Sequence, residues 1–185
     1  MNGPPDEVLI AAVLNGDREA FRSLVERYQE AYLGYADRML SSRAAAEDVV
    51  QDSFVTAYEK LETCERPERF ASWCFHIVRN RCHDHLRSPR SRTSAPENLD
   101  ALPADGEDPS EAVERSDLRA ALLRAVASLS PLLREAFVLY HEHSLTYPQM
   151  AERLGASESA LKMRVKRARE ELQARLSDFE DEVRT

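Results

Sequence analysis

The sequence predicts an all-α protein of two small helical domains joined by an acidic linker. Apolar residues recur at steps of three and four through most of the 185-residue chain, which is the period of helices with one buried face. Capping residues and helix-starting prolines precede several of these segments. The stretch 88–117 instead holds four prolines and a block of acids, so it cannot bury enough apolar surface to fold alone.

Composition bounds the class of protein and its location. No apolar run approaches the roughly 18 residues of a membrane span, and the acidic N-terminus lacks the basic and apolar zones of a signal peptide. Three cysteines without a CxxC pair suit a reducing compartment. We therefore expect a cytoplasmic protein with no membrane insertion.

The net charge of −8 is distributed unevenly along the chain. Residues 94–117 hold eight acids against one base, whereas residues 69–92 hold six arginines against one acid. Residues 161–169 carry five bases and no acid. Two basic segments therefore flank one acidic connector, an arrangement that allows nucleic-acid binding in spite of the overall charge.

The N-terminal part predicts a helix over residues 6–15, a longer one that Asp17 caps, and a third over about 45–61. The third helix buries Val50, Phe54, Ala57 and Leu61. Its opposite face presents acids and amides around one valine, namely Asp48, Gln51, Asp52, Val55 and Glu59. Such a face is either solvated or docks a basic partner helix, and the residues alone leave both interpretations open.

A further helix is predicted over 70–86, before Pro89. Its inner stripe consists of Phe70, Trp73, Cys74, Ile77, Val78 and Cys82, so we expect its outer side to carry Phe75, His76, Arg79, Asn80, His83, Asp84 and Arg87. An exposed aromatic ring among bases and amides suits stacking on unpaired nucleotides, although a plain surface helix would look similar. The cysteines and the histidines of this helix lie on opposed faces, which argues against zinc.

The C-terminal part predicts four helices: 118–129, a second from Pro131 that Ser130 caps, and two more around Gly155. Thr146 and Gln149 form a capping box, Gly155 permits the turn, and Ser157 caps the last helix. The last helix alternates an apolar stripe, Leu161, Val165, Ala168, Leu172 and Leu176, with basic residues. This pattern favours a helix-turn-helix that enters the major groove; a helical pair in a larger bundle is the alternative.

Enzyme chemistry finds little support in the sequence. The glycines form no phosphate-binding loop, and a Cys82–His85 pair would lack an orienting group and a pocket. We predict no catalytic residue, no metal and no cofactor.

With its segments in this order, the chain resembles a bacterial sigma factor of the extracytoplasmic-function (ECF) group over nearly its whole length. AEDVVQDSF at 46–54 resembles the polymerase-clamp helix of that family. FASWCFHIVRNRCHDHLR at 70–87 resembles its promoter-melting and minus-ten helix, and LTYPQMAERLGASESALKMRVKRAREEL at 145–172 its minus-thirty-five helix-turn-helix. The resemblance implies a sigma region two domain at 1–92, a linker at 93–117 and a region four domain at 118–185.

The resemblance also implies roles for particular residues. The clamp of the largest subunit of core RNA polymerase would contact Asp48, Gln51, Asp52 and Val55. The minus-ten strand of promoter DNA would contact Phe75, His76, Arg79, Asn80, His83 and Arg87, and the loop 64–69 would hold a base extruded from the duplex. The minus-thirty-five element would contact Ser157, Ser159, Lys162, Met163, Arg164, Lys166 and Arg167.

Two departures from the family pattern bear on these roles. Pro89 and serines interrupt the arginine run that many relatives carry after the minus-ten helix, and Met163 stands in an unusual ALKMR sequence. The family is commonly held inactive by an anti-sigma factor, so we expect one as a second partner. The alternatives are a helix-turn-helix regulator that acts without polymerase, and a sigma mimic that sequesters an anti-sigma factor.

Overall fold

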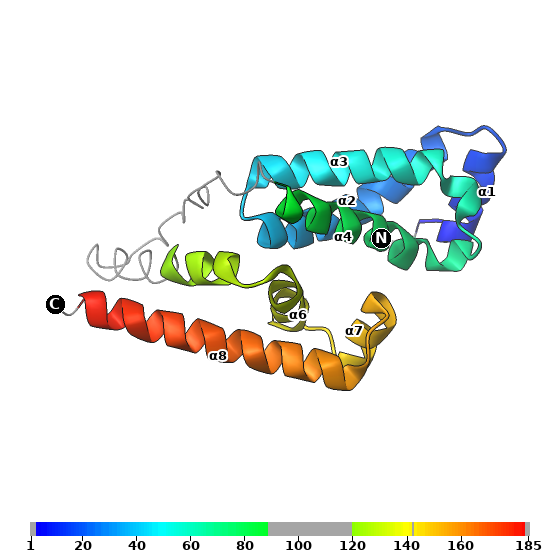
Figure 1. The fold of residues 1–185 in the computed structure, drawn as a ribbon. Coiled ribbons are helices and arrows are strands. Elements are labelled where there is room, and N and C mark those ends of the chain that lie inside the picture. The colour runs from blue at the N-terminus through cyan, green and yellow to red at the C-terminus, as the bar shows by residue number, and fades with distance from the viewer. Residues whose placement is uncertain (1–2, 89–119, 142, 184–185) are drawn as a thin grey trace, which may run out of the picture. The chain divides into compact units, whose positions relative to one another are not determined.

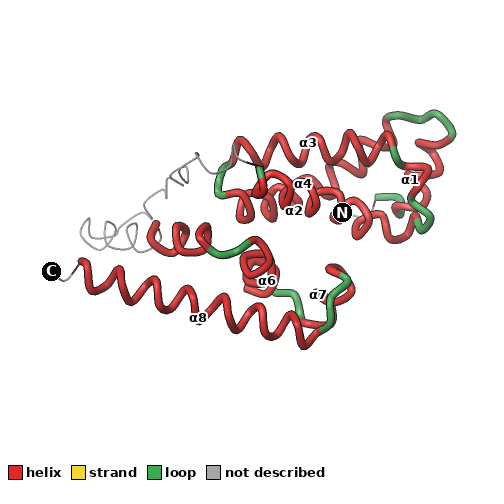
Figure 2. Tube along the Cα trace, in the orientation of Figure 1, coloured by secondary structure: helices red, strands yellow, loops and turns green. Residues whose placement is uncertain are grey.

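Every regular element that the computed structural model describes is a helix, as the sequence predicts. The described residues are 3–88, 120–141 and 143–183, and the chain divides into two compact units, Met1–Ser91 and Arg92–Thr185 (Figures 1 and 2). The predicted linker, 93–117, lies outside the described residues. None of the helices in the described ranges is both long enough and apolar enough to cross a bilayer.

The first unit is a helical bundle in which three long helices lie side by side and a short one closes one end (Figure 1). Its helices are α1 (Asp6–Leu14), α2 (Glu19–Leu40), α3 (Arg43–Glu59), the 3₁₀ turns η1 (Leu61–Thr63) and η2 (Pro67–Arg69), and α4 (Phe70–Arg87). The helices α2, α3 and α4 all pack on one another, while α1 packs on α2 and the two 3₁₀ turns.

Local polar groups set the limits of these helices. The Asp17 carboxylate accepts the N–H of Glu19 at 3.0 Å, so it satisfies a free donor at the start of α2. Ser41 takes a left-handed conformation (φ 54°) after α2, and the Ser42 hydroxyl accepts the N–H of Ala45 at 3.4 Å to begin α3. The turn between these two helices is therefore encoded by two adjacent serines.

The buried face of α4 differs from the predicted one. Phe75 and His83, expected on the outer side, are only 3% and 7% exposed, whereas Trp73 and Ile77 are partly exposed. The Phe75 ring lies 4.7 Å from that of Tyr35, edge to face. Because both α2 and α3 pack on α4, its buried arc is rotated around the helix from Trp73 towards Phe75. The prediction that Phe75 and His83 face solvent is wrong.

The C-terminal end of α4 lies just before Pro89, where the sequence departs from the family pattern. The helix runs to Arg87, and Ser88 is extended (φ −66°, ψ 140°). A residue before proline is pushed out of the helical region by the proline ring. Pro89 therefore sets the limit of this helix at Arg87, and the arginines beyond it lie outside the described residues.

The second unit contains a helix over residues 120–128, followed by α6 (Pro131–His141), α7 (Tyr147–Leu154) and the long α8 (Glu158–Val183). Both α6 and α7 pack on α8. Ala125, Val126 and Leu129 form an apolar cluster with Ala168 and Leu172 of α8. The apolar stripe of α8 is therefore the surface on which the other helices of this unit pack.

The predicted helix-turn-helix is present at α7 and α8. Thr146 and Gln149 form the capping box: the Thr146 N–H donates to Gln149 Oε1 at 2.8 Å, and the Gln149 N–H donates to Thr146 Oγ1 at 3.4 Å. Gly155 ends α7 in the left-handed region (φ 63°, ψ 32°). The Ser157 hydroxyl accepts the N–H of Ala160 at 3.3 Å at the start of α8.

Candidate protein-docking and nucleic-acid interfaces

The outer face of α3 presents the predicted acid-and-amide set. Asp48, Gln51 and Asp52 are exposed, and the Val55 side chain is 53% exposed although it is apolar. Asp52 pairs with Arg81 of α4 at 3.3 Å between Oδ2 and Nη1, while Asp48 forms no ion pair with any described residue. A single exposed valine is ordinary on a protein surface, and it indicates a docking site only where further apolar surface adjoins it.

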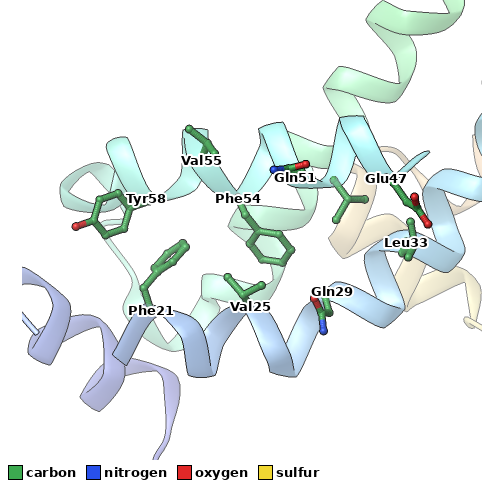
Figure 3. A pocket seen from close by; sticks show the side chains of 10 residues that line it. Phe21, Val25, Gln29, Leu33, Glu47, Gln51, Phe54, Val55 and Tyr58 are labelled. Carbon is green, nitrogen blue, oxygen red and sulfur yellow. The ribbon is translucent and has the colours of Figure 1, made fainter. Parts of the chain in front are cut away.

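An apolar groove adjoins this face, and sequence reasoning missed it (Figure 3). It has a volume of about 480 Å³ and lies between α2 and α3, lined by Phe21, Val25, Gln29, Leu33, Glu47, Val50, Gln51, Phe54, Val55 and Tyr58. Gln51 and Val55 belong to both surfaces. The sequence does hold one sign of the groove, because Val25, Gln29 and Leu33 recur every four residues and so share one face of α2. A groove also depends on the distance between two helices, and the pattern of a single helix contains no information about that distance.

The outer face of α4 carries four of the six residues predicted to hold the minus-ten strand. Asn80 and Arg87 are exposed, His76 and Arg79 are partly exposed, and Phe75 and His83 are buried and do not join them. Arg87 pairs with Asp84 at 3.6 Å, a fully solvated contact that contributes little stability. Trp73 stands seven residues before Asn80, about two helical turns, so its backbone position lies close to the line of Asn80 and Arg87. Its side chain is partly exposed, and its ring lies 5.9 Å from that of the buried Phe70.

The predicted base- and phosphate-contacting residues on α8 and at Ser157, which caps it, are all accessible. Ser157, Ser159, Lys162, Met163, Lys166 and Arg167 are exposed, and Arg164 is partly exposed. Two of the cations have nearby acids, since Lys162 lies 3.7 Å from Glu158 and Lys166 lies 3.6 Å from Glu170. The apolar side of the same helix is buried, with Leu161, Val165 and Ala168 at most 1% exposed. The helix therefore separates a core face from a cationic face.

The cysteines do not form a reactive site. Cys64, Cys74 and Cys82 are all buried, and none of the three forms a disulfide. Burial raises the pKa of the Cys74 thiol to about 12 and also raises that of Cys64, so neither is a thiolate at neutral pH. Within the described ranges no three metal-ligating side chains come together.

Two family descriptions match the chain, one in each unit. Residues 24–93 match sigma-70 region 2, and residues 119–172 match sigma-70 region 4. The first match covers α3 and α4 with their outer faces, and the second covers the helix-turn-helix. The fold and these surfaces therefore define a transcription initiation factor.

Similar proteins identify which group of transcription initiation factors the chain belongs to. The chain is 30% identical to the RNA polymerase sigma-H factor of Pseudomonas aeruginosa, over 89% of this chain and 90% of that protein. It is 29% identical to the ECF RNA polymerase sigma-E factor of Haemophilus influenzae, over 92% and 95% respectively. The chain belongs to the ECF group of RNA polymerase sigma factors.

Solved structures agree with this assignment. CnrH in complex with the cytosolic domain of CnrY has a TM-score of 0.62 and 28% identity, over 95% of this chain and 99% of CnrH. The sigma factor RpoE from Bartonella quintana, in complex with the anti-sigma factor NepR, has a TM-score of 0.61 and 26% identity, over 85% and 96%.

Proposed function

We propose that the protein binds core RNA polymerase through its first unit, directs it to promoters with two DNA-contacting helices, and assists duplex opening. The observation that carries this proposal is the separation of surfaces in the first unit. An acidic, partly apolar face lies on α3, and a basic-and-amide face lies on α4. One domain can therefore hold a protein and a nucleic acid together, while the cationic α8 supplies the second DNA contact.

The polymerase contact is assigned to Asp48, Gln51, Asp52 and Val55. Carboxylates at the rim of an apolar groove suit a partner helix that carries both basic and apolar side chains. The groove between α2 and α3 would receive the apolar side chains, while Asp48 and Asp52 would meet the basic ones. The partner on this surface is the clamp of the largest polymerase subunit.

The minus-ten contact is assigned to His76, Arg79, Asn80 and Arg87. Burial removes Phe75 and His83 from the set, and Trp73 is the partly exposed aromatic residue of α4, about two helical turns before Asn80. A partly exposed indole can stack on an unpaired base while the cations hold phosphates. The loop at residues 64–69 would hold a base extruded from the duplex, offsetting a few kcal/mol of melting.

The minus-thirty-five contact is assigned to Ser157, Ser159, Lys162, Met163, Arg164, Lys166 and Arg167. The residues on the exposed centre of α8 would face base edges, and those along its borders would face phosphates. Because Met163 is 48% exposed on this helix, it would bring an apolar contact such as a thymine methyl group prefers.

The remaining features of the proposal are organisational. Residues 1–92 and 118–185 form the two DNA-contacting domains, and residues 93–117 join them. The protein works in the cytoplasm and catalyses no reaction itself. RpoE is bound to an anti-sigma factor in its solved structure, which supports an anti-sigma factor as the second partner here.

Run-off transcription with purified core RNA polymerase on a library of promoter fragments tests the proposal. The expected result is transcripts from a subset of templates, with Asp48→Arg abolishing them. If no template gives a transcript, with or without removal of an inhibitor, the proposal is wrong. Promoter binding without polymerase, unchanged by Asp48→Arg, would instead identify a helix-turn-helix regulator. Binding of an anti-sigma factor without any DNA binding would identify a sigma mimic.

A further inference from the structure

The exposed residues of α8 lie at different positions around the helix. At 3.6 residues per turn, Ser159, Met163 and Arg167 follow one another at the centre of the exposed face, opposite the buried Leu161 and Val165. Lys162 and Arg169 stand seven residues apart along one border of that face. In a helix that enters the major groove, such a border faces the sugar-phosphate backbone.

Two tyrosines from other helices lie against this border. Tyr140, in the last turn of α6, and Tyr147, at the start of α7, stack with ring centroids 4.9 Å apart and planes at 26°. The Arg169 guanidinium carbon lies 5.3 Å from the Tyr140 centroid, and Lys162 Nζ lies 5.5 Å from the Tyr147 centroid. Each cation therefore faces an aromatic ring within the range of a cation–π interaction.

Arg169 has a second contact that fixes its direction. Its Nε–H donates to His141 Nε2 at 3.1 Å, and the His141 ring in turn lies 4.5 Å from that of Phe137. The histidine must be neutral at Nε2 to accept this bond. The bond uses one of the five N–H donors of the guanidinium, so four are left to bind an anion.

A hollow of about 490 Å³ opens beside the tyrosine pair, lined by residues 144–148 together with Tyr140, Glu158 and Lys162. Glu158 would repel an anion in this hollow, but its pairing with Lys162 at 3.7 Å offsets that charge. The tyrosine pair and Lys162 therefore border an open space, not a packed core.

We propose that Tyr140 and Tyr147 are positioning residues that hold Arg169 and Lys162 along one border of α8, where the two cations bind DNA phosphates. The inference rests on the proposed function, because it requires α8 to enter the major groove. Long cationic side chains lose rotamer freedom when they bind, and holding them in advance lowers that loss. Arg169, Tyr140 and Tyr147 thereby join the DNA interface.

The test measures binding of the full chain to a short duplex of mixed sequence across a series of salt concentrations. Phosphate contacts need no promoter sequence, and each contact contributes about 0.9 to the slope of log K against log salt. Tyr140→Leu is expected to weaken binding about two- to fivefold, the usual worth of an exposed cation–π contact. Tyr140→Leu should also lower the salt slope towards that of Arg169→Gln. Tyr140→Phe, which keeps the aromatic ring, should leave both the affinity and the salt slope unchanged.

A double-variant comparison separates positioning from general loss of structure. Arg169→Gln should lower the slope in the wild-type background but much less in the Tyr140→Leu background. Lys166→Gln, whose cation touches neither tyrosine, serves as the matched control and should lower the slope equally in both. Tyr147→Leu paired with Lys162→Gln repeats the comparison at the other ring, which covers the case in which Tyr140→Leu unfolds the second unit.

Each outcome decides between the two proposals. If the wild-type chain binds and Tyr140→Leu and Tyr147→Leu keep its salt slope, the positioning role is wrong and the proposed function stands. If Arg169→Gln acts equally in both backgrounds, Arg169 binds phosphate without help from Tyr140, which also overturns the inference. If the wild-type chain gives no salt-dependent binding, the assignment of α8 to DNA fails, and this inference fails with it.

Discussion

Arg81 of α4 reaches across to Asp52 of α3, with 3.3 Å between Nη1 and Oδ2, while its Nη2 donates to Thr56 Oγ1 at 2.7 Å. The pair links the helix proposed to bind polymerase with the helix proposed to bind the minus-ten strand. Both side chains are partly exposed, 39% and 66%, so the ion pair itself contributes at most about 1 kcal/mol. Its significance is that Asp52 is already engaged, whereas Asp48 remains available to a partner.

This difference predicts unequal effects of two substitutions on polymerase binding. Asp48→Arg should weaken binding to core RNA polymerase by about tenfold or more, because it places a cation against the basic partner surface. The free energy of unfolding should stay within about 0.5 kcal/mol of wild type, as for an exposed residue with no partner. Asp52→Asn should weaken polymerase binding less and lower stability slightly, since Arg81 loses its carboxylate.

Titration of labelled protein with core polymerase, followed by fluorescence anisotropy, measures the first effect, and urea unfolding measures the second. Glu7→Arg on α1 makes the same change of charge away from α3 and serves as the control. Equal losses for Glu7→Arg and Asp48→Arg would mean that net charge, and not the α3 face, governs binding.

The buried Phe75 predicts a loss of stability and not a specific DNA defect. Phe75→Ala removes a ring packed against Tyr35 and Tyr32 and should destabilise the first unit by about 3–5 kcal/mol. Asn80→Ala, on the exposed side of the same helix, should leave stability unchanged and slow promoter opening more than duplex binding. Thermal unfolding and permanganate reactivity of unpaired thymines distinguish the two. An unfolding midpoint of Phe75→Ala equal to wild type would contradict the packing of Phe75 on Tyr32 and Tyr35.

The contrast between Phe75 and Thr146 shows which features of the fold could be predicted from the sequence alone. The capping box of Thr146, the left-handed Gly155 and the existence of each described α-helix follow from neighbours in sequence, and the structure confirms them. The 3₁₀ turns η1 and η2 were not predicted from the sequence. The rotational orientation of α4 does not follow from the sequence, because residues 73–75 and 77–78 are all apolar. Several rotations of the helix about its axis would therefore bury a similar apolar area. Packing by both α2 and α3 selects the arc that includes Phe75.

The candidate interfaces show the same division. The exposed residues of α3 and α8 could be predicted from the period of one helix. The groove beside Val55 and the tyrosine pair beside Arg169 could not, because each arises where side chains from separate helices meet.

Tyr28 predicts a loss of stability at high pH. Its hydroxyl donates to Asp6 Oδ2 at 2.6 Å, and the same carboxylate accepts from Arg27 Nη1 at 2.5 Å. Burial, followed by the hydrogen bond and charge of Asp6, raises the pKa of Tyr28 to about 12. The folded chain therefore keeps a proton that the unfolded chain loses near pH 10. The stability that this proton contributes is present below about pH 10 and is lost as the pH rises towards 12.

Urea unfolding of the first unit, followed by the fluorescence of Trp73, the single tryptophan, should give a falling midpoint between pH 9.5 and 11.5. Tyr28→Phe removes the titrating group and should flatten that dependence. A slope that persists unchanged in the Tyr28→Phe protein would assign the effect to other groups.

Gly155 predicts a cost that comes from the backbone alone. It lies at φ 63° between α7 and α8, and a Cβ built there would meet nothing within 4 Å. Gly155→Ala should therefore destabilise the second unit by about 1–2 kcal/mol through its left-handed conformation, without any steric clash. Gly155→Asn should cost less, because asparagine tolerates this region.

Because the turn sets the direction in which α8 leaves α7, the two variants also test whether the helix pair acts as a unit. Hydrogen exchange of the α7 amides measures local opening, and binding to a mixed-sequence duplex measures the interface. If the folded Gly155→Ala protein keeps the turn, its duplex affinity should fall only by the fraction of molecules with α7 open. A larger loss, at equal protection of α7, would show that the substitution redirects α8 and that the geometry of the turn itself is part of DNA recognition.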